Sequence, residues 1–546
     1  MTHAASPSDA ETFDYVIVGA GAAGAVLANR LSTNPRVSVC LLEAGSPDTS
    51  PWLRIPAGFI KVVYDPAWTW QFSAEPTELT AGRRIALPQG RTLGGTTSIN
   101  GMIYNRGQAA DYDEWAAQGC PGWSYREVLP YFRRSQRWLG PTDDDYHGRT
   151  GELPVSHLAW HHPICEAFIA GAVAAGLPRN RDYNGADQAG VGYFQRTIGG
   201  RWRSSTARAF LRPIRARANL AIRTRAQTTQ VLFDGPRATG VRYMQGDGQH
   251  TRTVLARREV VLCCGTLNTP RLLELSGIGH PSRLSALGIE LRHALPGVGE
   301  NLADHFSVRV VARVANARTI NELSRGVGLA GQIARWIIGR PSLLSVSPSL
   351  VHWFARSSSE VARPDLQGVF TPASYREGAI GVLDDYPGMT AGVWAHRPKS
   401  RGSIHLRSAD PREPPLIQAN YLSHPEDRHT LVRGIRMARN LLRMPELARY
   451  FQSESLPGSE IDDDDALLSF AKRYGVSAQH LVGTARMGSP DDTGAVVGPD
   501  LKVHGLSGLR VADASVMPAT PSGNTCAATM MIGEKGADLL LATPGG

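Results

Sequence analysis

Three glycines near the start of the chain have the spacing of a phosphate-binding turn. Gly19, Gly21 and Gly24 follow the apolar run 15–18 and precede a helix-like pattern. In such a turn the first glycine permits a tight bend, the second lets a pyrophosphate approach the backbone, and the third lets the helix pack closely on the strand. The helix N-terminus offers free N–H groups and a positive dipole end to the phosphates. The sequence therefore predicts a dinucleotide site.

An acidic residue, Glu43, ends the next apolar run, residues 37–42. It follows Gly24 at close to the spacing of ~20 residues at which an acid binds a ribose hydroxyl. A carboxylate at this position disfavours the 2′-phosphate of NADP, but it does not distinguish NAD from FAD. The same glycine spacing recurs at residues 326–331 without a buried strand before it, and we predict a loop there.

The elements that would position this site follow one another in the order strand, helix, strand, and this alternation predicts an α/β fold. Residues 220–224, 229–233 and 238–243 alternate like antiparallel strands. The region 309–478 differs, with irregular strands, several prolines and helices, and indicates a second structural unit. Its basic apolar segment 329–338 is most simply a buried amphipathic helix, and the alternative is a contact with a membrane or a lid over the site.

Size and composition narrow the class of protein. A chain of 546 residues accommodates two or more domains, and 42% hydrophobic and 20% charged residues are typical of a globular protein. The net charge of +9 comes almost entirely from scattered arginines, which argues against a nucleic-acid partner. No apolar run reaches the ~18 residues of a transmembrane helix.

The N-terminal residues and the cysteine content indicate the cellular compartment. Residues 1–12 lack the apolar core of a secretory signal and are expected to form a disordered tail. The six cysteines form no CxxC pair, and the cysteines and histidines show no metal-ligand spacing. We therefore expect a cytoplasmic protein without structural disulfides and without a metal site.

Four long segments resemble one family. Residues 90–113, 265–279, 297–305 and 508–537 are similar to motifs of the glucose–methanol–choline (GMC) flavin oxidoreductases, in particular the branch of bacterial alcohol and choline dehydrogenases. The resemblance spans nearly the whole chain and implies FAD as the cofactor. It also implies a discontinuous Rossmann-like FAD-binding domain and a substrate domain with a mostly antiparallel sheet covered by helices. The implied boundaries are 1–155, 215–308 and 480–546 for the FAD domain, and 156–214 and 309–479 for the substrate domain.

The resemblance also implies roles for individual residues. The ADP half of FAD would be held at the glycine turn and Glu43, with Val231 facing the adenine. Further residues would line or approach the flavin: Arg91, Gly95, Asn100, Gly101, Met102, Ile103, Asp513 and Ala514. Some members attach the flavin covalently through a histidine, but the matching position is Ile99, so we expect non-covalent FAD.

Two residues match the family's catalytic pair. His480 stands in a His-Leu-Val-Gly-Thr sequence where a proline usually follows the histidine, and Gln479 replaces a frequent aromatic residue. These departures concern the substrate pocket. Asn524 matches the second position. Taken alone, a histidine before a turn is most often structural; with the resemblance, His480 is expected to take the hydroxyl proton and Asn524 to bind the developing alkoxide.

The predicted function is FAD-dependent oxidation of an alcohol to an aldehyde or ketone, with hydride transfer to flavin N5. The expected partners are a small alcohol and an electron acceptor, which is oxygen, a quinone or another compound. One alternative is a non-redox member that keeps FAD, like the plant hydroxynitrile lyases. Others are a light-driven fatty-acid decarboxylase and a flavin-holding binding protein.

Overall fold

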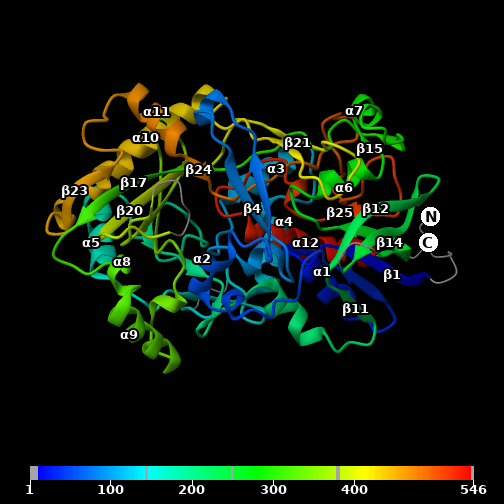
Figure 1. Ribbon diagram of the computed structural model, residues 1–546, viewed down its shortest axis with the longest axis horizontal. Helices are drawn as coiled ribbons and strands as arrows, with labels where there is room; N and C mark the ends of the chain where they lie inside the picture. The colour runs from blue at the N-terminus through cyan, green and yellow to red at the C-terminus, as the bar shows by residue number, and fades with distance from the viewer. Residues whose placement is uncertain (1–9, 142–144, 247–249, 377–381, 543–546) are drawn as a thin grey trace.

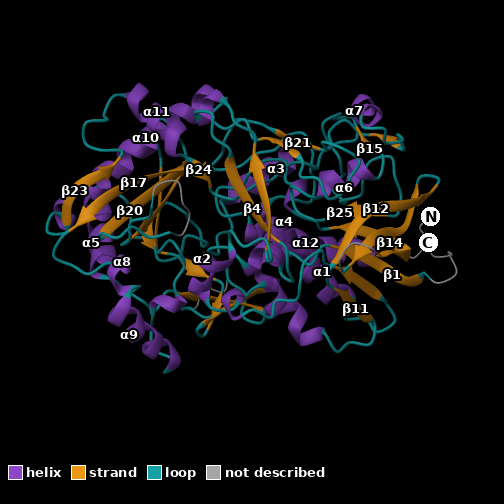
Figure 2. Cartoon of the chain, viewed as in Figure 1, coloured by secondary structure: helices purple, strands orange, loops and turns teal. Residues whose placement is uncertain are grey.

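The computed structural model describes residues 10–141, 145–246, 250–376 and 382–542. Two large sheets lie toward opposite ends of its long axis, and helices lie between and over them (Figures 1 and 2). Each sheet has its own hydrophobic core. This mixed architecture confirms the predicted fold class, whereas the domain boundaries stay a prediction.

The first sheet combines a parallel core with an antiparallel hairpin. Its order is β11-β2-β1-β14-β13-β12, with β25 beside β14. Strands β11, β2, β1, β14 and β25 run parallel, and β12, β13 and β14 pair antiparallel. The antiparallel prediction is thus correct for β12 and β13 and wrong for β11, because β11 follows a crossover and joins the edge of β2. The strands are β1 (Glu11–Val18), β2 (Val39–Leu42), β11 (Leu220–Arg223), β12 (Ala226–Asp234), β13 (Arg237–Gln245), β14 (His250–Leu262) and β25 (Leu509–Val511).

The second sheet is antiparallel throughout. Its order is β23-β17-β20-β19-β18-β7, with β24 also beside β17, and helix α10 packs against β17 and β20. Helices α5 and α11 flank α10. The strands are β7 (Gly190–Tyr193), β17 (Phe306–Val314), β18 (Val351–Ala355), β19 (Leu366–Thr371), β20 (Gly388–Ala395), β23 (Phe451–Leu456) and β24 (Val476–Ser477).

Helices surround the two sheets, and α1 packs against the C-terminal α12 beside the first sheet. The helices are α1 (Ala22–Leu31), α2 (Phe59–Val62), α3 (Ala109–Ala117), α4 (Tyr125–Ser135), α5 (Pro163–Ala174), α6 (Thr269–Leu275), α7 (Pro281–Ala286), α8 (Ile320–Leu323), α9 (Gly326–Ile337), α10 (Pro425–Leu442), α11 (Asp464–Tyr474) and α12 (Cys526–Ala542). Smaller pairs are β3 (Thr69–Ala74) with β4 (Ile85–Gly90), β9 (Ile198–Gly199) with β10 (Trp202–Arg203), β15 (Ile278–Gly279) with β16 (His293–Ala294), and β21 (Ser403–His405) with β22 (Leu416–Gln418). A small three-stranded sheet contains β5 (Gln136–Trp138), β6 (Leu153–His157) and β8 (Gln195–Arg196).

Helix α9 corrects two predictions. The glycines expected to form a loop at residues 326–331 instead lie in the first turns of this helix, which continues to Ile337. The helix expected to be buried has no buried residue and projects from the lower left of the molecule (Figure 1). Its contact with the body includes Trp336, whose ring meets that of Trp202 at 4.7 Å.

The ends and the cysteines give three further findings. Residues 1–9 of the expected tail lie outside the described residues, and Glu11 and Thr12 already belong to β1. Among the helices that the structure describes, none has the length and apolar character needed to cross a membrane. All six cysteines are free thiols.

Candidate active site

The glycine turn between β1 and α1 is tightly packed at two glycines and open at the third. A Cβ atom at Gly19 would lie 2.3 Å from the Cys263 carbonyl oxygen, and one at Gly24 would lie 1.9 Å from the Gly19 carbonyl oxygen. At Gly21 a Cβ atom would meet nothing within 4 Å, and this residue lines the main cavity. The backbone at Gly21 therefore faces open space at the N-terminus of α1, as a bound pyrophosphate requires.

The Glu43 carboxylate is fixed beside this turn. Its two oxygens accept hydrogen bonds from the backbone N–H groups of Ala20, at 3.0 Å, and Gly45, at 2.8 Å. Burial raises the pKa of Glu43 to about 7, although these hydrogen bonds and the nearby Arg91 favour the ionised form. The side chain lines the cavity, where its remaining lone pairs can accept a hydrogen bond from a ribose hydroxyl.

We expect Glu43→Ala to weaken FAD binding about 10- to 150-fold, since it removes a charge-assisted hydrogen bond of roughly 1.5–3 kcal/mol. The measurement is flavin occupancy after gel filtration over a range of low protein concentrations. Glu43→Gln is the matched control, because it keeps the size and one acceptor oxygen; it should lose less flavin. Equal occupancy in all three proteins would contradict a role for Glu43 at the cofactor.

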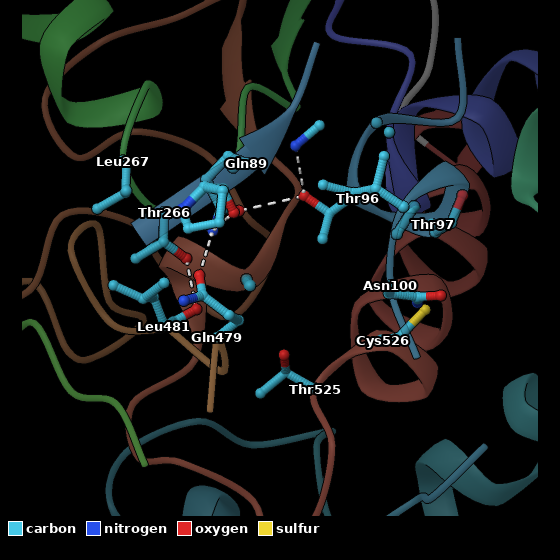
Figure 3. Close-up of a pocket in the computed structure, with 18 of the residues that line it drawn as sticks. Gln89, Thr96, Thr97, Asn100, Thr266, Leu267, Gln479, Leu481, Thr525 and Cys526 are labelled. Atoms are coloured by element: carbon cyan, nitrogen blue, oxygen red, sulfur yellow. Dashed lines mark hydrogen bonds between the residues drawn. The ribbon is translucent and has the colours of Figure 1, made fainter. Parts of the chain in front are cut away.

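A cavity of about 440 Å³ extends from the glycine turn to the second sheet. In the part drawn in Figure 3, Thr266, Leu481 and Gln479 lie on one side, and Asn100 and Cys526 lie opposite. The wall is thus assembled from segments that are far apart in the sequence. The predicted site residues that line it are Gly19, Gly21, Glu43, Gly95, Asn100, Gly101, Met102, Ile103, His480, Asp513, Ala514 and Asn524.

Three predicted site residues do not line the cavity. Gly24 lies beneath the turn, and the Arg91 guanidinium lies 4.4 Å from the centre of the Trp70 ring. Val231 is buried in the core of the first sheet, while the first three residues of its strand β12 reach the cavity. The start of β12, and not Val231 itself, therefore borders the cavity, and the adenine contact of Val231 stays a prediction.

A chain of hydrogen bonds determines which nitrogen of His480 carries a proton. His305 Nε2 lies 2.7 Å from the carbonyl oxygen of His396, which can only accept, so this nitrogen is protonated. Burial lowers the pKa of His305 to about 4, so its ring is neutral at pH 7 and its Nδ1 is an acceptor. His480 Nδ1 lies 2.9 Å from that atom and therefore donates its proton to it.

The Nε2 atom of His480 is consequently unprotonated. The Asn524 side-chain N–H donates to it at 2.8 Å, and the Asn524 oxygen accepts from Gln367 at 3.2 Å, which orients the amide. Burial, and next the adjacent His305, lower the pKa of His480 well below the usual histidine value. The cavity wall thus holds a proton acceptor and a hydrogen-bond donor side by side at neutral pH.

Four residues that support His480 were not assigned roles from the sequence. The Asp304 carboxylate accepts the backbone N–H of His480 at 2.8 Å, and the Trp394 ring lies 5.8 Å from the His480 ring. Asp304 and His305 belong to the motif 297–305, so that motif was the available signal. Gln367 and Trp394 lie on β19 and β20, where no motif marks them.

The described residues fit FAD and show no metal centre. The open backbone at Gly21, the adjacent Glu43 carboxylate and the continuous cavity suit an elongated dinucleotide. Ile99, which also lines the cavity, has a hydrocarbon side chain that cannot form a covalent link to a flavin. No group of three or more His, Cys, Asp or Glu side chains within the described ranges is arranged to hold a metal ion.

Comparison with known proteins identifies the family. The sequence models of the GMC oxidoreductase N- and C-terminal parts match residues 13–307 and 398–533. An alcohol dehydrogenase [acceptor] of Pseudomonas putida is 40% identical over 97% of this chain and 96% of its own. An oxygen-dependent choline dehydrogenase of Photobacterium profundum is 39% identical over 97% of this chain and 93% of its own.

Solved structures agree with this assignment. Pyridoxine 4-oxidase from Mesorbium loti has a TM-score of 0.87 at 29% identity and covers 96% of this chain and 98% of its own. A formate oxidase has a TM-score of 0.91 at 26% identity and covers 98% of this chain and 99% of its own. The chain belongs to the GMC oxidoreductase family and is an FAD-dependent enzyme that acts on CH–OH donors.

Proposed function

We propose that the protein oxidises an alcohol to an aldehyde or ketone with His480 as the base. The observation that supports this most strongly is the hydrogen-bond chain from His396 through His305, which leaves Nε2 of His480 unprotonated at the cavity wall. When bound, FAD supplies the acceptor for the substrate hydride at its N5 atom.

The side chains of the protein handle the proton and the oxygen. His480 Nε2 takes the hydroxyl proton, and the Asn524 N–H donates to the oxygen as negative charge develops on it. Because Nδ1 of His480 is held by His305, the ring gains its proton at Nε2 without changing tautomer. Asp304 holds the backbone of His480 in place meanwhile.

The test is anaerobic mixing of the holoenzyme with a panel of alcohols. An accepted alcohol should bleach the yellow flavin, since the two electrons of the substrate have no other destination. Persistent colour with every alcohol would contradict alcohol oxidation and would favour a non-redox, hydroxynitrile-lyase-like member. Parallel assays with oxygen and with a quinone or dye identify the electron acceptor, which differs even between the names of the two relatives.

The proposal includes non-covalent binding of FAD and a cytoplasmic location. The isoleucine at position 99 supports non-covalent FAD, which acid precipitation would release into the supernatant. The six free thiols support a cytoplasmic, reducing environment.

We also propose that α9 contacts the surface of an anionic membrane. Apolar side chains are exposed on it, with Val327 90% and Ile337 62% accessible, and Ile338 beyond its end 68% accessible. Three arginines and no acidic residue occur in residues 325–340, which gives this segment a charge complementary to anionic headgroups. The same positive charge would oppose pairing with a second copy through this helix.

Replacing Val327, Ile337 and Ile338 together with serine should reduce binding to phosphatidylglycerol vesicles by about 10-fold or more, because each side chain contributes roughly 1 kcal/mol on partial insertion. Cosedimentation measures the bound fraction. Leu291→Ser is the control, since Leu291 is 45% exposed outside α9. Equal binding of wild type and the triple variant, or no binding to either anionic or neutral vesicles, would refute the membrane contact.

A further inference from the structure

One face of the second sheet forms the wall of the cavity beyond His480. Alternate residues of three strands reach it, as expected for side chains on one face of a sheet. On β17 and β20, Arg309 pairs with Gly392 in the antiparallel register. The lining residues from these strands are Ser307 and Arg309 of β17, Thr390, Gly392 and Trp394 of β20, and Val369 and Thr371 of β19.

Among the residues that the structure describes, none supplies an anionic partner for Arg309 in this wall. Other buried arginines pair with oxygen atoms: Arg439 with Glu454 at 2.7 Å, and Arg203 with the Asn100 side-chain oxygen at 2.9 Å. For Arg309, the neighbours among the described residues are tyrosines: the Tyr375 ring lies 5.4 Å from the guanidinium carbon, and Tyr64 also interacts with it electrostatically. Burial lowers the pKa of Arg309. Even a partly buried cation is costly unless an anion compensates its charge.

The carboxylates among the described residues that line the cavity make hydrogen bonds in another part of it. They are Glu43, at the glycine turn, and Asp513, which accepts hydrogen bonds from the Gly265 N–H and the Thr269 hydroxyl. Both lie with the first sheet and its turns, away from the strand that carries Arg309. The described lining near Arg309 therefore has a positive charge and no protein carboxylate.

Space for a ligand near Arg309 is the cavity that its side chain lines. The opposing residue, Gly392, also lines the cavity. Its backbone packs closely against Val369, since a Cβ atom at Gly392 would lie 2.9 Å from a Val369 methyl. The Tyr375 ring is held by a hydrogen bond from its hydroxyl to the Pro348 carbonyl at 3.0 Å. Arg309 thus has a fixed aromatic neighbour, Tyr375, and also borders the cavity.

Strand geometry relates this position to the catalytic histidine. Trp394, whose ring lies near His480, is two residues from Gly392 on β20. Two residues of a strand span roughly 7 Å. A group bound at Arg309 would therefore lie several bonds away from the carbon that is oxidised.

We propose that Arg309 is the specificity residue for a carboxylate on the substrate, so that the enzyme's substrates are hydroxy acids whose carboxylate lies several bonds from the hydroxyl. The inference rests on the proposed alcohol oxidation. A guanidinium forms paired hydrogen bonds with a carboxylate. A phosphate dianion fits less well, because the other arginine that lines the cavity, Arg271, donates to Asn268 and to backbone carbonyls. A cationic alcohol would meet Arg309 and, among the described residues that line this part of the cavity, no compensating carboxylate.

The test compares ω-hydroxy acids of about four to eight carbons with their carboxamides, which keep the length and lose the charge. Wild type should oxidise the acids with a KM about 10- to 150-fold lower than that of the amides. Arg309→Met should remove this difference by raising the KM for the acids alone. Arg309→Lys keeps the positive charge but not the planar guanidinium, so it should retain part of the KM difference between acids and amides.

Two measurements distinguish failure of the carboxylate proposal from failure of the proposed alcohol oxidation. Binding of adipate, which has no hydroxyl to oxidise, should perturb the flavin absorbance of wild type and not of Arg309→Met, whether or not any alcohol is oxidised. Flavin content should be equal in the three proteins. Equal KM values for acids and amides in wild type would overturn the proposal, and loss of FAD from both Arg309 variants would assign the residue to the cofactor instead.

Discussion

Replacing His480 with alanine should leave the fold and bound FAD intact and slow flavin reduction by an accepted alcohol about 10²- to 10⁴-fold. That range is the usual contribution of a general base, equivalent to roughly 3–5.5 kcal/mol of barrier. The structure supports a large effect, because His480 Nε2 is an unprotonated nitrogen at the cavity wall and Asn524, its neighbour there, has no basic atom. Stopped-flow absorbance under anaerobic conditions measures the rate.

The pH dependence provides a second expectation for the same residue. Because burial and His305 lower the pKa of His480, its neutral form persists below the usual histidine range. The wild-type rate should therefore be flat through neutral pH and fall only at more acidic pH, where the ring becomes protonated. His161→Ala is a suitable control, since the His161 side chain is 57% exposed and outside the cavity lining. A His480→Ala enzyme that reduces its flavin at the wild-type rate would refute the assignment.

The local part of the site could be predicted from the sequence. The strand, the glycine turn, the helix and Glu43 are close in the chain, and each follows from a spacing rule that depends on nearby residues. Where chemistry depends on contiguous residues, the sequence is sufficient.

The part of the site that depends on long-range pairing could not be predicted. His305 meets His480 because Phe306 pairs with Ser477 and Ala303 with Val482, and no local pattern reveals that register. Val231 shows the same limit, since its strand was identified but the residues that reach the cavity were not. For α9 the periodicity identified a helix, but it did not show that the apolar side would face outward, because that depends on what the rest of the fold leaves uncovered.

Replacing Asn524 with alanine should slow flavin reduction about 10²- to 10³-fold, the loss typical of one donor to a developing oxyanion. In the structure the Asn524 amide is held by Gln367 with its N–H directed at His480 Nε2, so the two groups are adjacent and one substrate oxygen lying beside both can contact both. Asn524→Asp is the informative companion, because it keeps the size and replaces the donor with an ionisable acceptor. It should be at least as slow as alanine at neutral pH.

The double variant of His480 and Asn524 distinguishes two independent contributions from one shared site. If both side chains act on the same substrate oxygen, the second substitution should cost much less in the background of the first, and the combined loss should remain near that of His480→Ala alone. Strict multiplication of the two losses would mean that Asn524 acts somewhere other than at the alkoxide. A normal rate in Asn524→Ala would show that the hydrogen bond to His480 is only structural. Flavin content and the unfolding midpoint, measured for every variant, ensure that the comparison concerns the proton transfer and not the loss of cofactor.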